Sequence, residues 1–285
     1  MCTTKAELVA ALAVRPGRRA VVMTMGALHE GHLSLVRRAK ELADVVVVTD
    51  FVNPLQFAPD EDFDTYPRDL EGDVTLLREA GVDVVFAPTE EEMYPREPLV
   101  RVDPGPVATR YEGEARPTHF AGVVQVVAKL LHLTQPDWAI FGQKDAQQLA
   151  LIRTMVEDLD FPVQIVGVPI AREDDGVARS SRNAYLDETE RARARALSEA
   201  LEAAAAELRA AREAGGRATP ASLEAAARDY LTQAPGVDPD YVVAVDAATF
   251  LPAEEEADEI VLALAARVGT TRLLDNRTFT LRQGA

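Results

Sequence analysis

The run VVVVTDFV, from Val45 to Val52, restricts the fold of this chain more than any other stretch. β-Branched residues follow one another there almost without interruption, which suits a strand buried on both faces, as parallel sheets require. Other short apolar stretches predict further strands of the same sheet at residues 20–25, 82–87, 138–142 and 163–168. Helices are predicted at residues 5–14, 70–80, 120–133 and 146–158, and a Pro-rich loop at residues 93–113. The first part of the chain therefore predicts an α/β domain built on a parallel sheet.

The pattern changes near residue 170. Residues 189–213 are rich in Ala, Glu and Arg without a helix breaker, and Pro220 opens a second predicted helix that extends to about residue 233. Three stretches then predict antiparallel strands, at residues 241–246, 260–266 and 271–281. The change from βαβ alternation to two helices and three strands predicts a domain of residues 1–170 and a smaller α+β domain of residues 171–285.

The stretch from Val21 to Arg38 joins a predicted strand to a predicted helix through a turn at Gly26. The first N–H groups of a helix lack internal partners and carry partial positive charge, so this junction favours an anion such as phosphate. His29 and His32 are spaced so that both imidazoles project from one face at the helix N-terminus, where they can donate hydrogen bonds to phosphate oxygens. A single histidine would more often be a helix cap or a surface residue. The pair flanking Gly31 after a buried strand favours a ligand site.

Polar residues also follow two other predicted strands. Ligands of open α/β sheets lie beyond the carboxyl ends of the strands, so Asn53 and Gln56 can reach one, although both are equally typical of turns. In the string GQKD, Lys144 is a point charge suited to phosphate, and Asp145 can accept from a ribose or adenine donor or cap the next helix.

Three further segments carry candidate functions. The string SSR, Ser180 to Arg182, offers two hydroxyls and a guanidinium that could clamp phosphates, although alone it indicates a linker with a helix cap. Arg116 and His119 precede the helix at 120–133, and we expect them to line the cleft. The acidic segment 58–69 lacks the ligand spacing and glycine of a calcium loop, so we expect it to be solvated.

Composition limits the compartment and the partners. The chain has 285 residues, 47% of them hydrophobic, and no apolar run long enough to span a membrane. Its N-terminus has no signal or transit pattern, and its only cysteine, Cys2, cannot form an intramolecular disulfide, so we expect a cytoplasmic protein. A net charge of −17 argues against nucleic acid or an anionic membrane as a partner. An anionic substrate therefore needs local donors, and a Mg²⁺ ion would help to neutralise nucleotide phosphates.

The H-x-G-H string after a hydrophobic strand is similar to the signature of the nucleotidyltransferase superfamily, which is related to class I aminoacyl-tRNA synthetases. Longer strings together resemble the pantoate–β-alanine ligase family along almost the whole chain: TMGALHEGHLSLV, FVNPLQF, RPTHFAGV, FGQKDAQQL, SSRNAYL and TTRLLDN. The resemblance implies a Rossmann-like domain that binds ATP and pantoate, a C-terminal lid domain and a homodimer. It also implies the condensation of (R)-pantoate with β-alanine through pantoyl adenylate, with release of AMP and pyrophosphate and with Mg²⁺ accompanying ATP.

The resemblance also assigns roles to individual residues. Catalytic roles fall to His32, as proton donor, and to His29, Lys144 and Arg182. The ATP-binding set comprises Met25, Gly26, Ala27, Leu28, His29, Glu30, Gly31, His32, Gly142, Gln143, Lys144, Asp145, Ala171, Arg179, Ser180, Ser181 and Arg182. Pantoate is assigned to Gln56, Gln148, Asn53 and Met25, and no residue is assigned as a metal ligand.

Arg179 departs from the family pattern, which usually has Met before the two serines. The departure is harmless if that position meets the nucleotide through its backbone, but it would alter affinity or loop motion if the side chain packs on adenine. Two rivals to the ligase share part of the pattern. One is a cytidylyl- or adenylyltransferase acting on a phosphorylated metabolite, and the other is a nucleotide-sensing protein without turnover. Neither a P-loop nor a G-x-G-x-x-G string is present.

Overall fold

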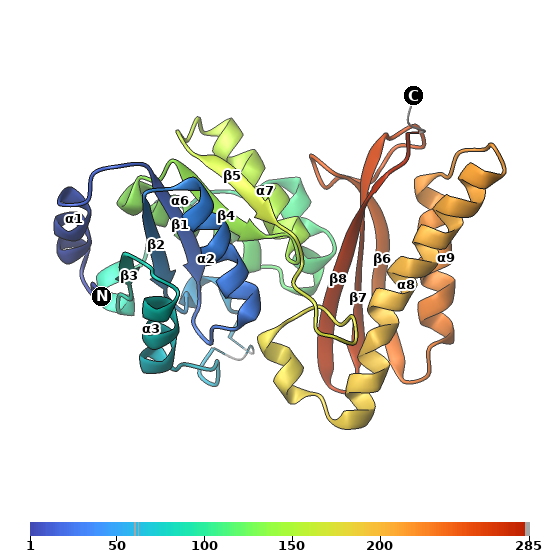
Figure 1. Cartoon of the computed structure of the whole chain (residues 1–285), viewed down its shortest axis with the longest axis horizontal. Helices are drawn as coiled ribbons and strands as arrows, with labels where there is room; N and C mark the ends of the chain where they lie inside the picture. The colour runs from blue at the N-terminus through green and yellow to red at the C-terminus, as the bar shows by residue number, and fades with distance from the viewer. Residues whose placement is uncertain (60, 62, 283–285) are drawn as a thin grey trace. The chain divides into compact units, whose positions relative to one another are not determined.

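The chain forms two compact units in the computed structural model, which describes residues 1–59, 61 and 63–282 (Figure 1). The first unit consists of Met1–Gln143 and Leu151–Pro169, and the second of Lys144–Ala150 and the chain from Ile170 onward. The predicted domain limits differ from these units in the segment Lys144–Ala150, which groups with the later part of the chain.

The first unit is built on a five-stranded sheet with the order β3-β2-β1-β4-β5, in which every pair is parallel. Its strands are β1 (Arg19–Thr24), β2 (Val45–Asp50), β3 (Val84–Phe86), β4 (Trp138–Gly142) and β5 (Gln164–Val168). Residues 45–49 of β2 are all buried, as the β-branched run predicts. The order reverses beside β1, the strand that leads into the H-x-G-H string, and ligands of such sheets bind at this switch point.

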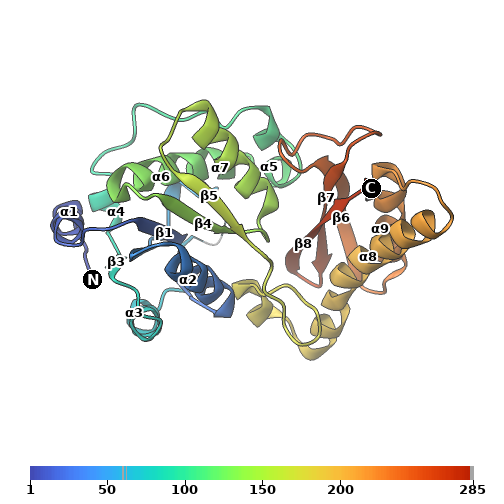
Figure 2. The same ribbon diagram turned by 45° about the horizontal axis from the view of Figure 1, so that its top comes forward.

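Helices cover both faces of this sheet (Figure 2). The longer ones are α1 (Lys5–Ala13), α2 (Glu30–Leu42), α3 (Leu70–Glu79), α6 (His119–Thr134) and α7 (Ala146–Asp158). Helices α2 and α3 lie on one face, where Leu35, Val36 and Leu77 pack on the strands, and α6 and α7 lie on the other. The predicted loop at 93–113 is interrupted by short helical turns at Pro106–Thr109 and α5 (Glu112–Ala115), and α4 (Glu90–Met93) precedes it.

The second unit pairs α8 (Glu188–Glu213) and α9 (Pro220–Gln233) with an antiparallel sheet of the order β6-β7-β8. Its strands are β6 (Val237–Asp246), β7 (Glu259–Val268) and β8 (Thr271–Thr280). Alanines and leucines along α8 pack with alternate residues of β7 to form the core of this unit. β6 begins earlier than predicted, and its register shifts between Pro239 and Tyr241, because proline has no N–H to give to the ladder.

Within the residues that the structure describes, no helix is both long and apolar enough to cross a membrane.

Candidate active site

The turn after β1 is held by one buried carboxylate. Gly26 and Ala27 have positive φ angles of 82° and 51°, so the backbone reverses sharply there. Asp73 of α3, only 3% exposed, accepts hydrogen bonds from the backbone N–H groups of Ala27 and Leu28, both at 2.8 Å. The turn that leads into α2 is therefore fixed by a side chain from another helix.

The two histidines of H-x-G-H cap α2 with one ring nitrogen each. His29 is the N-cap residue, and its Nδ1 accepts from the N–H of Gly31 at 3.1 Å. His32 Nδ1 accepts from the N–H of His29 at 3.2 Å, and the ring centroids lie 4.1 Å apart. Because each Nδ1 is an acceptor, a neutral imidazole here carries its proton on Nε2. Capping and ligand binding are thus compatible, since the ring nitrogen that carries the proton is not the one that caps the helix.

Gly31 is required by its neighbour rather than by its own backbone angle. A Cβ at this position would lie 2.8 Å from Cε1 and 2.9 Å from Nδ1 of His29. Any larger residue would therefore push the His29 ring out of its capping position.

A second aspartate lies behind the same turn. Asp50 ends β2, and its Oδ1 would lie 2.8 Å from a Cβ on Gly26, where Asp73 Oδ2 would lie at 3.1 Å. Burial and the nearby charge of Asp73 raise the pKa of Asp50 to about 6. Both aspartates line a cavity of about 390 Å³, which also borders on Met25, Phe63 and Arg68.

Gln56 is held beside Met25 by a chain of amides. Its Nε2 lies 2.8 Å from Met25 Sδ, and its Oε1 accepts from Asn53 Nδ2 at 3.1 Å. Asn53, 1% exposed, also donates to the carbonyl of Gly122 and accepts from the hydroxyl of Tyr94. Gln56 is thus brought to the H-x-G-H turn, whereas the contacts of Asn53 place it behind Gln56 as a support.

Arg116 and His119 both contact the backbone carbonyl of Gln56. Arg116 Nη2 is 3.3 Å from that oxygen and His119 Nδ1 is 3.1 Å from it. Arg116 also forms a two-point pair with Glu61 at 2.8 and 2.5 Å. Burial opposes ionisation of Glu61, but the hydrogen bonds and charge of Arg116 outweigh it and lower the pKa of Glu61. The expectation that segment 58–69 is solvated is therefore wrong at Glu61, while Asp60 and Asp62 lie outside the described residues.

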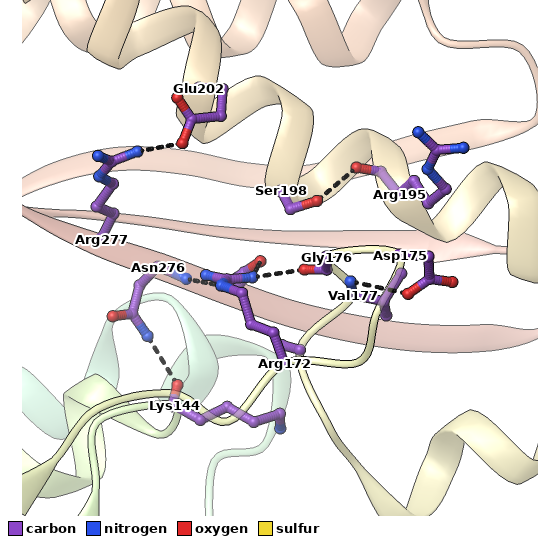
Figure 3. Close-up of polar contacts among 12 residues, drawn as sticks. Lys144, Arg172, Asp175, Gly176, Val177, Arg195, Ser198, Glu202, Asn276 and Arg277 are labelled. Carbon is purple, nitrogen blue, oxygen red and sulfur yellow. Dashed lines mark hydrogen bonds and ion pairs between the residues drawn. The ribbon is translucent and has the colours of Figure 1, made fainter.

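A second group of predicted site residues lies at and after the end of β4. Gly142 has open space where a Cβ would stand, and the N–H of Gln143 donates to the carbonyl of Val168 at 2.8 Å. In the second unit, Lys144 Nζ lies 3.9 Å from Asp145 Oδ1, and Gln148 is half-buried on the first turn of α7. Figure 3 shows the carbonyl of Lys144 accepting a hydrogen bond from Asn276 Nδ2, at 2.8 Å.

The SSR string follows a small hairpin of the second unit. The N–H of Arg179 donates to the carbonyl of Ala171 at 2.9 Å, and the Arg179 guanidinium lies 3.9 Å from Glu173. Ser180 caps the turn Ser181–Tyr185, accepting from the N–H of Arg182 at 3.3 Å. The helix-cap alternative thus describes Ser180, and the side chain of Arg179 is turned toward its own hairpin.

Three supporting residues were missed from the sequence: Asp73, Glu61 and Asn276. Each contacts a site residue far away along the chain, and no local pattern marks such a contact. The sequence around Asp73 does not indicate that its carboxylate binds the turn at Ala27 and Leu28. Asn276 stands in the string TTRLLDN, to which the resemblance assigns no residue role.

The sheet order and the H-x-G-H turn at its switch point define the chain as a Rossmann-like α/β protein with a smaller antiparallel domain. The family model described as pantoate-beta-alanine ligase matches residues 1–278. The chain belongs to the pantoate-beta-alanine ligase family.

Individual relatives agree with this assignment. The pantothenate synthetases of Acidothermus cellulolyticus and Streptomyces avermitilis are 53% and 50% identical, over 96% and 94% of this chain and 89% and 94% of theirs. The crystal structure of pantothenate synthetase from Thermus thermophilus has a TM-score of 0.88 and 47% identity, covering 97% of this chain and 99% of that one. A pantoate-beta-alanine ligase from Francisella tularensis, complexed with beta-gamma ATP and beta-alanine, has a TM-score of 0.76 and 31% identity, covering 99% and 98%.

The predicted family, the fold class and the ligase class are thereby confirmed. The roles assigned to individual residues stay predictions, and they are taken up as proposals below.

Proposed function

We propose that this chain joins (R)-pantoate to β-alanine in two steps at the expense of ATP. In the first, a pantoate carboxylate oxygen attacks the α-phosphorus, and the bond to the bridging oxygen of pyrophosphate breaks. In the second, the β-alanine amine attacks the acyl carbon of pantoyl adenylate, AMP leaves with the bonding electrons, and the amine loses a proton. The product is pantothenate.

The observation that carries the proposal is the orientation of the two histidine rings. Backbone N–H groups occupy Nδ1 of His29 and His32, so each neutral ring carries its proton on Nε2, and an imidazole N–H is a donor suited to phosphate oxygens at a helix N-terminus. Such donors favour charge that builds up on the phosphates as pyrophosphate leaves. Protonation of either ring would turn Nδ1 into a donor facing a backbone N–H, which would weaken the cap.

The remaining assignments complete the proposal. Gln56 and Gln148 bind the hydroxy acid, with Met25 beside Gln56 and Asn53 behind it. Lys144, Ser181 and Arg182 offset phosphate charge, and Asp145 accepts from the nucleoside. Ser180 also offsets phosphate charge through its hydroxyl. The ATP-binding set is completed by Gly26, Ala27, Leu28, Glu30, Gly31, Gly142, Gln143, Ala171 and Arg179.

Mg²⁺ enters the proposal together with ATP. Across residues 1–59, 61 and 63–282 no three His, Cys, Asp or Glu side chains are grouped to hold a metal ion. Mg²⁺ needs fewer protein ligands, because it usually keeps several waters and binds substrate phosphates through one or two carboxylates. When bound, it would neutralise charge on the phosphates. A homodimer, which the family resemblance implies, and the cytoplasmic location expected from the sequence complete the proposal. Sedimentation velocity of the purified protein tests the dimer.

The reaction is tested by mixing the protein with Mg·ATP and pantoate, with and without β-alanine, and by following the products by mass spectrometry. We expect a stoichiometric pyrophosphate burst from pantoate alone, and pantothenate with AMP only when β-alanine is present. Absence of pyrophosphate under every condition would favour a nucleotide-binding protein or a transferase with another acceptor.

His32→Ala tests the role of the histidines directly. Loss of one charge-stabilising donor should slow single-turnover adenylate formation by about 10²–10³-fold. His132→Ala is the matched control, because His132 is exposed on α6 and packs on Phe161 with ring centroids 5.1 Å apart. Unchanged adenylate formation in His32→Ala would remove His32 from the mechanism.

A further inference from the structure

Two consecutive buried polar residues of β8 point to opposite faces of its sheet. Asp275 and Asn276 are 2% and 7% exposed, and successive side chains of a strand alternate between faces. Asp275 pairs in register with Leu264, which belongs to the core beneath α8, and Asn276 pairs with Ala263, which does not belong to that core cluster. The pair can therefore contact two different segments of the second unit at the same time.

Asn276 contacts the backbone of Lys144. Its Nδ2 donates to the Lys144 carbonyl at 2.8 Å, between residues 132 positions apart in the sequence (Figure 3). Lys144 opens the short segment Lys144–Ala150 of the second unit, directly before α7. A hydrogen bond to the carbonyl of this residue fixes the point from which its side chain departs.

Asp275 contacts the hairpin that leads into the SSR string. Its two oxygens accept from Arg172 Nη1 at 2.7 Å and Nη2 at 2.9 Å, and Oδ1 also accepts from the N–H of Asn276 at 2.8 Å. Arg172 Nη1 also donates to the carbonyl of Gly176 at 2.9 Å. The hydrogen bonds that Arg172 donates to Asp275 raise the pKa of Arg172 despite its burial, so the guanidinium stays charged.

The same hairpin is continuous with Ser180 and Arg182. Arg172 pairs with Ala178 in an antiparallel bridge, and the next residue, Arg179, donates its N–H to Ala171. Ser180 begins directly after that bond. The position where the SSR string starts is therefore set by the hairpin, and the hairpin is tied to β8 through the pair between Arg172 and Asp275.

We propose that Asp275 and Asn276 form a positioning dyad for the ligase reaction. Asn276 positions Lys144 through its carbonyl, and Asp275 positions the Ser180–Arg182 string through Arg172. Neither role requires contact with substrate. The inference deepens the proposed function and rests on the roles given there to Lys144 and Arg182.

The decisive experiment is a double-mutant cycle on single-turnover adenylate formation, followed by pyrophosphate release. Asn276→Asp keeps the side-chain volume but replaces the donor with an acceptor that faces the Lys144 carbonyl. We expect a loss of about 10–100-fold, because a misplacement of about 1 Å can cost 10²-fold. In a Lys144→Ala background the same substitution should cost less than about 3-fold, since its effect passes through the missing side chain.

Arg277→Gln is the matched control. Arg277 is the next residue of β8 and forms an exposed pair with Glu202 of α8, so its loss should leave adenylate formation and the ATP KM within about 2-fold (Figure 3). Asn276→Ala provides a second variant if Asn276→Asp does not fold. Thermal unfolding of every variant shows whether a loss of activity follows a loss of structure.

The positioning role of Asp275 is measured in the same way, with Asp275→Asn alone and in an Arg182→Ala background. We expect the ATP KM to rise and the two losses to be non-additive. Losses that multiply in both cycles would overturn the dyad, because a merely structural defect acts independently of Lys144 and Arg182. Full activity of Lys144→Ala would overturn both the proposed role of Lys144 and the positioning role of Asn276. Multiplying losses in an active wild-type ligase would overturn only the dyad.

Discussion

The turn that carries H-x-G-H and the hairpin that leads into the SSR string are held by different forces. The turn is fixed by hydrogen bonds that the backbone N–H groups of Ala27 and Leu28 donate to the buried Asp73, and by glycines that leave no room for a Cβ. Residues 173–191 are instead linked by arginine pairs at the surface, such as Arg191 with Asp175 at 2.8 Å and with Glu173 at 3.6 Å. The Asp175 hydrogen bonds raise the pKa of Arg191, and Arg191 lowers the pKa of Asp175.

This difference sets how each region responds to change. Surface ion pairs stabilise by about 0–1 kcal/mol and are weakened by salt. A buried donor or acceptor that loses its hydrogen-bond partner costs about 1–3 kcal/mol. A substitution in the turn should therefore cost activity or stability steeply. A substitution among the surface pairs of residues 173–191 should instead be absorbed by neighbouring pairs.

Gly31→Ala, which tests the turn, should have the largest effect on activity. The new Cβ would stand 2.8 Å from His29 Cε1, so the ring must leave its capping position. Alanine is the better residue for a helix, by about 0.5–1 kcal/mol, so the fold should not suffer. We expect adenylate formation to fall by about 10²–10³-fold while thermal unfolding changes by only a few degrees.

Gly216→Ala is the control for this substitution. Its Cβ would meet the carbonyl of Ala211 at 3.5 Å, an ordinary contact, after the end of α8. It should keep full activity. A Gly31→Ala enzyme with wild-type single-turnover rates would show that the position of the His29 ring does not matter, and the turn would then be as tolerant as the hairpin.

The sequence predicted the elements whose ends are marked by glycine, by proline or by a break in the apolar pattern. β4, α7 and α9 begin and end where glycine, proline and the apolar period placed them. The four-residue helices α4 and α5 were missed because a single turn has no period to detect. The H-x-G-H turn was predicted as a site because a buried strand, a glycine and two histidines stand together in one string.

The supporting contacts could not be predicted in the same way. Asp73 contacts Ala27 across 46 positions, and Asn276 contacts Lys144 across 132. Nothing in the flanking residues distinguishes these side chains from solvated ones. Their partners are also backbone groups, so no complementary residue type marks the other end. The role of Gly31 was equally hidden, because the atom that excludes a Cβ belongs to the side chain of His29.

Asp50→Asn should have an intermediate effect that depends on pH. The pKa of Asp50 is raised to about 6 by burial and by Asp73, so the folded state gains a proton before the unfolded state as pH falls. The charged carboxylate therefore destabilises the fold above about pH 6, and this cost is relieved between about pH 6 and pH 4. Allowing for its partial exposure, we expect Asp50→Asn to raise the free energy of unfolding by about 1–2 kcal/mol at pH 8 and by almost nothing at pH 4.

Urea unfolding of both proteins across this pH range measures the effect. Asp229→Asn, on an exposed part of α9, is the control and should show no such dependence. A gain from Asp50→Asn that is equal at pH 4 and pH 8 would show that the carboxylate is not strained by its surroundings, and that the turn is not backed by a buried charge.

Arg179→Met, which tests the hairpin, should have the smallest effect on ATP binding and on adenylate formation. The guanidinium lies 3.9 Å from Glu173 and donates to the carbonyl of Arg172 at 3.3 Å, while the backbone N–H of Arg179 makes the bond to Ala171 that any residue can make. Glu173 keeps Arg191 as a second partner, so the pair is partly redundant. We expect the ATP KM and the rate of adenylate formation to change by less than about 3-fold, in line with the worth of an exposed pair. A large loss of ATP affinity, measured by equilibrium titration at low and high salt, would instead make Arg179 a phosphate ligand. The hairpin would then depend on a single side chain as strongly as the turn does.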